Sequence, residues 1–461
     1  MSISKLDLIV EGITRMTQEE REDLASKMLS PVKICRHLPA KEHNDIIRKA
    51  NPRWTDEQLK DYLVSEIPMQ VIYAGEEMPE KITKSIFLAG PTPRSKSLVS
   101  WRQDALTILD HYRYDGVVFI PEPRDGEFTS NYDDQVNWEE KYLNVADCIV
   151  FWVPRDLEAD PDNFPSAKMP AFTTNVEFGA WASSGKIVFG APPDAPKNSY
   201  LKHYAQKYNV KVSEHLPGVL MDAVMMLEKG AERSGGERYV PLFVWKTDSF
   251  QSWYKAQTEA GNRLDEAQLL YTFRPRFKSF VFLSVLKAKM YVAAEDRFKE
   301  NEFVLSRPDI SSVCLYHFPS DGDATNDNEI VLVKEFRTPA STKDGFIREL
   351  PGGSSKSEAN AEKVAAEELF EETGFHIDPS RLKSQGARQL AGTLSSHKSH
   401  LYCAELNKEE INWFKSQAGI VHGNIEDTER TFIEVLPVWQ IIRDELVDWT
   451  TLGQILSVLI Y

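Results

Sequence analysis

SIFLAGPTP, residues 85–93, is an apolar run that ends in glycine and proline, and the same design recurs three times downstream. The three later runs are GVVFIPEP (116–123), DCIVFWVP (147–154) and KIVFGAP (186–192). Amphipathic segments such as WRQDALTILDHY (101–112) separate them. Buried strands that alternate with helices are typical of a parallel sheet, so we expect a flavodoxin-like or Rossmann-like α/β domain over residues 83–232.

Short turns follow these strands, and a helix, TTNVEFGAWA (173–182), precedes the last one. Ligands of open parallel sheets bind beyond the carboxyl ends of the strands, which is where the turns are expected. Glu177 lies near the predicted start of the helix, where the positive end of the helix dipole favours an ionised carboxylate. That state suits a nucleophile that attacks an anomeric carbon. An ordinary helix-capping glutamate is the alternative.

The motifs IFLAGP (86–91), NVADCIVFWVPRD (144–156) and EFGA (177–180) resemble the nucleoside 2-deoxyribosyltransferase family. The resemblance covers residues 83–232 and implies transfer or hydrolysis at the glycosidic bond of a nucleoside or nucleotide. It implies that Glu177 attacks the sugar carbon, that Asp147 assists, and that Gly90-Pro91 lines the sugar or phosphate pocket. Ala171 replaces an aspartate that is frequent in the family, and we expect Asn175 to take over its hydrogen bonds.

Polar and aromatic side chains of the same domain are candidates for base stacking or phosphate contacts, with ordinary packing as the alternative. They are Trp101, Arg102, Tyr132, Gln135, Trp138 and Glu139.

A second chemical motif follows the glycines of ELPGG (349–353) in EELFEETGF (367–375). Glu368 lies three and four residues before Glu371 and Glu372, so a helix would place these carboxylates on one face. Such a cluster suits Mg²⁺ or Mn²⁺, which can bridge a diphosphate and activate water. A solvated acidic face is the alternative.

Anchored on Gly353, this segment resembles the Nudix box, and VLVKEFRTP (331–339) resembles the ADP-ribose pyrophosphatase branch of that family. The resemblance implies an α+β Nudix hydrolase domain over residues 276–461, with Arg337 and Glu349 beside the substrate. It also implies a catalytic base in a later loop, Glu429 or Glu426. Two positions depart from the box, since Ala359 replaces a glutamate and Glu367 replaces an arginine.

The rest of the chain carries less chemistry. Residues 1–82 contain helical patterns and are expected to form a helical extension, and 233–275 is too apolar for a flexible linker, which predicts a folded connector. The spacing of His397, His400 and Cys403 resembles a zinc site only weakly, because no second ligand pair is evident.

The composition limits the classes of protein to which the chain can belong. The chain has 461 residues, a net charge of −16 and 42% hydrophobic residues, which predicts a soluble multidomain protein. The negative charge disfavours binding to nucleic acid or anionic membrane. The four cysteines are scattered, the N-terminus does not resemble a secretion signal, and no apolar run approaches the ~18 residues of a membrane span. We therefore expect reduced thiols and a cytoplasmic location.

Together these features predict a bifunctional enzyme that acts on nucleotides. One domain would cleave or exchange an N-glycosidic bond, and the other would hydrolyse a nucleoside diphosphate derivative such as ADP-ribose or NAD. A nucleotide-binding sensor is the first alternative, motivated by the departures at Ala359, Glu367 and Ala171. An enzyme with one active domain, and a homodimer formed through the Nudix half, are further options.

Overall fold

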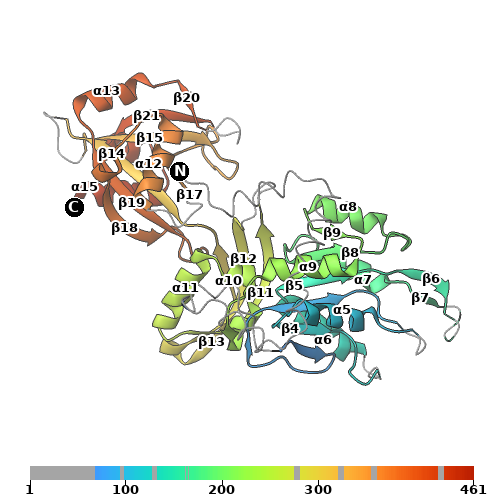
Figure 1. Cartoon of the computed structure of the whole chain (residues 1–461). Helices are drawn as coiled ribbons and strands as arrows, with labels where there is room; N and C mark the ends of the chain where they lie inside the picture. The colour runs from blue at the N-terminus through green and yellow to red at the C-terminus, as the bar shows by residue number, and fades with distance from the viewer. Residues whose placement is uncertain are drawn as a thin grey trace. The chain divides into compact units, whose positions relative to one another are not determined.

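The computed structural model describes residues 55, 68–93, 98–126, 132–160, 162, 164, 166–274, 281–319, 326–354, 361–423 and 430–460. These residues belong to two compact units, Met1–Arg233 and Ser234–Tyr461 (Figure 1).

A six-stranded sheet forms the centre of the first unit, and all neighbouring strands in it are parallel. The order is β1-β4-β3-β5-β8-β9. The bounds are β1 Gln70–Tyr73, β3 Ser85–Ala89, β4 Val117–Ile120, β5 Cys148–Trp152, β8 Ile187–Gly190 and β9 Val212–Ser213. The four apolar runs form β3, β4, β5 and β8, which are completely buried. The predicted parallel α/β fold is confirmed for this unit.

The strand order reverses between β3 and β5, because β4 lies on one side of β3 and β5 on the other. Ligands of such sheets bind at this switch point, beyond the carboxyl ends of the strands. Helices α6 and α7 pack on the sheet face that carries Phe87, Phe119, Phe151 and Phe189. Helix α9 packs against β5 and β8 and contacts α5. The bounds are α5 Trp101–His111, α6 Tyr132–Val145, α7 Phe172–Trp181, α8 Ser199–Lys207 and α9 Leu216–Leu227.

Two short two-stranded sheets complete the first unit. One joins β2 (Lys81–Ile82) to β10 (Arg233–Ser234), and the other joins β6 (Asp156–Ala159) to β7 (Ala167–Met169).

The assignment of residues 1–82 to a helical extension is wrong for the described part of that segment. Residues 70–73 form β1, which pairs with β4 over its whole length, and 81–82 form β2. Short strands such as QVIY escape a periodicity argument because four residues do not define a period. The helices predicted from 17–28 and 55–67 lie outside the described residues, apart from Thr55.

The second unit begins with a three-stranded antiparallel sheet, β11-β12-β13. Its core also contains residues of the preceding segment, including Val240, Val244 and Phe250. The predicted connector is therefore folded, but the predicted boundary at 275 falls inside this sheet, since β11 comes from the connector. The elements are η1 Gly235–Tyr239, α10 Leu242–Trp245, α11 Asp248–Glu259, β11 Arg263–Phe273, β12 Leu283–Val292, η2 Ala293–Glu295 and β13 Arg297–Ser306.

A mixed sheet of order β18-β19-β14-β15-β21-β20 follows, with β16 on β15 and β17 on β14. One core joins this sheet to α12 and α13, and a separate core joins it to α14 and α15. The strands are β14 Ile310–His317, β15 Glu329–Phe336, β16 Phe346–Glu349, β17 Gly352–Ser354, β18 Lys383–Gln389, β19 Lys398–Glu405, β20 Val421–His422 and β21 Thr431–Pro437. The helices are α12 Ala361–Thr373, η3 Pro379–Arg381, α13 Lys408–Ser416, α14 Val438–Arg443 and α15 Trp449–Ile460.

Cys148, Cys314 and Cys403 are buried free thiols, each within or at the start of a strand. In the part of the chain that the structure describes, no helix is long and apolar enough to cross a membrane.

Candidate functional site

Glu177 lies in the middle of α7, and its side chain is partly buried. The pKa of its carboxyl is raised to about 7, first by burial and then by the charge of Glu139, whereas the charge of Arg102 lowers it. The expected stabilisation of the Glu177 anion by the helix N-terminus is therefore wrong. The dipole effect is confined to the first turn, and desolvation favours the neutral acid.

Glu139 of α6 is the second carboxyl of this site. Gln135, one turn earlier, donates from Nε2 to Glu139 Oε1 at 3.0 Å. Burial raises the pKa of Glu139, while the hydrogen bond from Gln135 and the charge of Arg102 lower it. Two interacting carboxyls titrate as a pair rather than singly. Because the pKa of Glu177 is about 7, the pair retains one proton into the neutral range.

Arg102 of α5 is completely buried and holds the loop that follows β3. Its Nε donates to Leu88 O at 2.9 Å and its Nη2 donates to Gly90 O at 2.8 Å. Its Nη1 donates to Thr92 Oγ1 at 3.1 Å and forms an ion pair with Glu122. These bonds engage the guanidinium within the protein, so Arg102 supports the loop and acts on the two carboxyls through its charge.

Gly90 and Pro91 occupy the position expected for a ligand-binding loop, beyond the carboxyl end of β3. Gly90 has a φ of 152°, and a Cβ there would overlap the carbonyl oxygen of Trp152. Only glycine tolerates both conditions. Pro91 O accepts a hydrogen bond from Trp101 Nε1 at 3.2 Å, which fixes the loop from the side of α5.

Asn175 lies one turn into α7 and is bonded to a cation from the loop after β5. Arg155 Nη2 donates to Asn175 Oδ1 at 2.6 Å, and Arg155 Nε has no partner among the described residues. Ala171, which precedes α7, has a φ of 57°. This left-handed conformation is uncommon for alanine. Substrate binding by Asn175 stays a prediction, with Arg155 as its neighbour.

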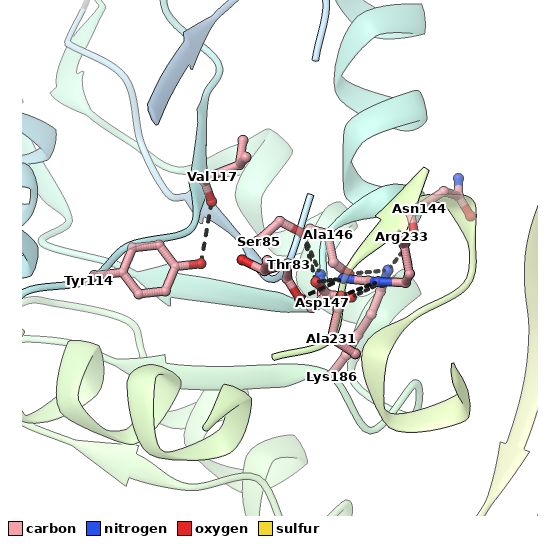
Figure 2. A network of polar contacts seen from close by, with 10 residues as sticks. All are labelled: Thr83, Ser85, Tyr114, Val117, Asn144, Ala146, Asp147, Lys186, Ala231 and Arg233. Atoms are coloured by element: carbon pink, nitrogen blue, oxygen red, sulfur yellow. Dashed lines mark hydrogen bonds and ion pairs between the residues drawn. The ribbon is translucent and has the colours of Figure 1, made fainter. Parts of the chain in front are cut away.

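Asp147 lies directly before β5, at the amino edge of the sheet (Figure 2). Arg233 donates to its two oxygens at 2.7 and 2.6 Å, and Ser85 Oγ donates at 3.0 Å. Both charged side chains are completely buried. The five residues of β5 extend over about 16 Å, so Asp147 lies far from a ligand at the carboxyl edge. These contacts give Asp147 a structural role at the amino edge, and its predicted catalytic role stays a prediction.

Lys186, directly before β8, belongs to the same amino-edge network (Figure 2). Its Nζ donates to the carbonyl oxygens of Leu143, Asn144 and Ala146 at 2.6, 2.8 and 3.0 Å. Carbonyls at a helix end need such donors. Burial lowers the pKa of Lys186 to about 7, although the charge of Asp147 raises it. This network stabilises the end of α6 and the starts of β5 and β8.

The aromatic candidates for base stacking are packing residues instead. Trp138 is 8% exposed, donates from Nε1 to Glu76 O at 2.9 Å, and packs against Tyr142 with ring centroids 4.5 Å apart. Trp101 is equally buried. The side chain of Tyr132 lies outside the described residues.

In the second unit, two of the three clustered glutamates face the glycine strand β17. Gly352 N–H donates to Glu372 Oε2 at 2.8 Å. The carboxylate of Glu368 lies so close to Gly353 that a Cβ there would overlap it. Glu372 is buried and Glu371 is exposed. Helix α12 therefore presents Glu368 and Glu372 to the strand and Glu371 to solvent.

The predicted substrate residues Arg337 and Glu349 lie side by side, with Nη2 of Arg337 3.4 Å from Oε1 of Glu349. Arg337 also pairs with Glu335 at 2.8 Å. Arg307 donates from Nη2 to Ser354 Oγ of β17 at 2.6 Å. Burial and the charge of Arg337 lower the pKa of Arg307, and the charge of Glu349 raises it. Two guanidinium groups thus gather near β17.

Among the described residues, no group of three or more His, Cys, Asp or Glu side chains is arranged to hold a metal ion. The Mg²⁺ or Mn²⁺ ligands Glu368, Glu371 and Glu372 therefore stay a prediction, as does the weaker zinc option. Carboxylate oxygens do suit these ions chemically. The candidate bases Glu426 and Glu429, and Ala359 of the box, lie outside the described residues.

Residues 83–195 match the model of a family described as nucleoside 2-deoxyribosyltransferase like. This region is a nucleoside 2-deoxyribosyltransferase-like domain. A search of curated proteins found no match to the chain. The matched region contains both carboxyls, Glu139 and Glu177, and the cation Arg102 that acts on them.

The interaction of Glu139 with Glu177 and the position of Arg307 were not predicted from the sequence. A signal for Glu139 was present, because Gln135 and Glu139 are one helical turn apart and flank Trp138, a core residue. Arg307 follows a polar strand and carries no comparable signal.

Proposed function

We propose that the nucleoside 2-deoxyribosyltransferase-like domain cleaves or transfers the N-glycosidic bond of a nucleoside or nucleotide. The supporting observation is that burial and the charge of Glu139 raise the pKa of Glu177 to about 7, so that these two carboxyls hold one proton near neutral pH. One carboxyl can then be ionised while the other is an acid. Glycosidic chemistry that uses two carboxyl groups needs this division of roles.

In the proposed reaction, the proton of Glu177 first passes to Glu139, and the ionised Glu177 then attacks the anomeric carbon as the bond from that carbon to the base nitrogen breaks. The electron pair of that bond goes to the base, and the proton of Glu139 neutralises it. The resulting glycosyl ester of Glu177 is then attacked by water or by a second base, whose proton returns to Glu139. Arg102 supports the ionised state because its charge lowers the pKa of both carboxyls.

The pH dependence of base release tests this assignment. We expect kcat/KM to fall above about pH 7, because the pair then loses its last proton. Glu139→Gln should lower kcat/KM by about 10²-fold or more and remove the alkaline limb. The measurement is chromatography of free base over a nucleoside and nucleotide panel between pH 5 and pH 9 (about two units on either side of the pKa). An unchanged alkaline limb in Glu139→Gln would exclude Glu139 as the acid.

We further propose that the second unit is a Nudix-type hydrolase for a nucleoside diphosphate derivative. Arg337 beside Glu349, with Arg307 nearby, offers charges suited to a diphosphate. Glu368 and Glu372 would hold the metal, which supplies Lewis-acid activation when it is bound. The two proposed activities fit one substrate class, since molecules such as NAD and ADP-ribose contain a glycosidic bond and a diphosphate.

Glu368→Gln tests the metal role in the second unit. We expect Mg²⁺-dependent hydrolysis of ADP-ribose to fall by about 10²-fold or more, because a metal contributes several kcal/mol to charge stabilisation. The matched control is Glu367→Gln, one residue earlier, whose side chain is exposed and pairs with Lys363 at 3.6 Å. Mass spectrometry of the products provides the measurement. Equal rates for the two variants would count against the hydrolase.

A nucleotide sensor remains the competing function for the second unit, and the exposed position of Glu371 favours it. A sensor would be stabilised against heat by ADP-ribose and Mg²⁺ without forming product. Steady turnover by the same preparation would rule the sensor out.

A further inference from the structure

A hollow of about 350 Å³ lies between β18, β19 and α15 of the second unit. It is on the sheet face away from α12, because its residue Leu401 shares a core with Ile455 of α15, whereas α12 belongs to the other core. The hollow is therefore separate from the proposed metal site. Its lining comprises Gln385, Gly386, Arg388, Gln389, Leu390, Ser399, Leu401, Trp449, Thr450, Gly453, Gln454 and Ser457.

Trp449 and Gly453 shape one wall of this hollow. Trp449 begins α15 and is 87% exposed. Gly453 follows one helical turn later, so both residues lie on the same helix face. A Cβ at Gly453 would meet nothing within 4 Å. Glycine within a helix is less favourable than alanine, and here it leaves open space beside an indole ring.

The opposite wall is polar and carries one positive charge. Arg388 pairs with Ser399 in register, which places the two side chains on the same sheet face. Ser399 Oγ in turn accepts from Gln454 Nε2 of α15 at 2.9 Å. Gln385 and Gln389 add two more amides. The described residues that line the hollow include no Asp or Glu, so an anion would meet no carboxylate there.

We propose that this hollow is an additional nucleotide-binding site, distinct from both proposed catalytic sites. The exposed indole of Trp449 offers a stacking surface for a base. The Nε2 groups of the glutamines donate within the protein, and their amide oxygens can accept from the edge of a base. The guanidinium of Arg388 matches one phosphate. The volume is within the range of about 300–1,000 Å³ that small-ligand sites occupy. A nucleoside monophosphate satisfies all of these features.

Fluorine NMR of the full chain labelled with 5-fluorotryptophan tests the proposal, using AMP as the probe. The resonance of Trp449 is assigned as the signal missing from Trp449→Phe. We expect AMP to shift this resonance saturably. Adenosine lacks the phosphate and ribose 5-phosphate lacks the base, so we expect each of them to cause the same shift only at concentrations about tenfold or more higher. The substitution Arg388→Gln should weaken the binding of AMP by about the same factor.

Gly453→Leu supplies the matched structural variant. It fills open space and improves helix propensity, so we expect it to fold at least as stably as the parent chain while abolishing the AMP shift of Trp449. The proposal is overturned if the Trp449 resonance does not respond to AMP, or if it responds equally in Gly453→Leu. Because this readout is local to Trp449, it is independent of whether either catalytic activity is found.

Discussion

Glu177→Gln is expected to lower the rate of base release by about 10⁴-fold or more, because the variant lacks the group that attacks the sugar. Glutamine keeps the size of the side chain, so the site geometry is preserved. The measurement is single-turnover release of base from the best substrate of the panel. The control is Glu140→Gln, an exposed position on α6. Base release by Glu177→Gln at the parental rate would exclude Glu177 as the nucleophile.

The same variant should be more stable than the parent chain at alkaline pH. The pKa of Glu177 is raised from 4.5 to about 7, so the folded state binds more protons than the unfolded state between these values. Stability therefore falls as pH rises through this window and stays low above it. Each unit of pKa shift corresponds to about 1.4 kcal/mol in the free energy of unfolding. Solvent screening of the partly buried carboxyl makes the actual loss of stability smaller than this.

Denaturant unfolding at pH 5 and pH 8 (about 0.5 unit above the lower pKa and 1 unit above the upper one) measures this effect. We expect the gain of Glu177→Gln over the parent to be larger at the higher pH. A gain that is equal at both values would mean that the raised pKa is not a property of the folded protein. The two readouts separate loss of activity from loss of fold.

Arg233→Met is expected to lower the free energy of unfolding of the first unit by about 3–5 kcal/mol, because it leaves the buried Asp147 carboxylate without its partner. Both side chains are completely buried, and two hydrogen bonds of 2.7 and 2.6 Å join them. The double variant Asp147→Leu with Arg233→Met removes both charges and should recover most of this loss. Denaturant titration followed by far-UV circular dichroism provides the measurement.

The double variant also decides between a structural and a catalytic Asp147. If Asp147 is structural, the folded fraction of the double variant keeps the parental kcat for base release. A loss of kcat comparable to that of Glu177→Gln, in protein shown to be folded, would support the catalytic assignment of Asp147.

Local patterns in the sequence were sufficient to predict the four apolar strands of the first unit. They also predicted the edge of the sheet at which we place the site. The runs beginning at Ser85 and Cys148 became buried parallel strands, because continuous apolar runs can be buried on both faces of a sheet. The loop Gly90-Pro91 lies beyond the carboxyl end of β3, as its place in the sequence directly after the apolar run predicts. The parallel arrangement also placed Asp147 at the amino edge, because Asp147 directly precedes β5.

The pairing of distant groups was decided only by the tertiary structure. Glu139 and Glu177 are on different helices, and their mutual effect on pKa depends on how α6 and α7 pack over the sheet. Likewise, β1 is recognisable as a strand only through its pairing with β4.

The sequence by itself determined the four buried strands β3, β4, β5 and β8 and the helix that carries Glu177, since hydrophobic periodicity is a local property. The tertiary structure alone decided that Glu139 and Arg102 act on Glu177, and that Asp147 serves the fold through Arg233. Burial and charge proximity cause both outcomes, and neither is encoded in any single segment of the chain.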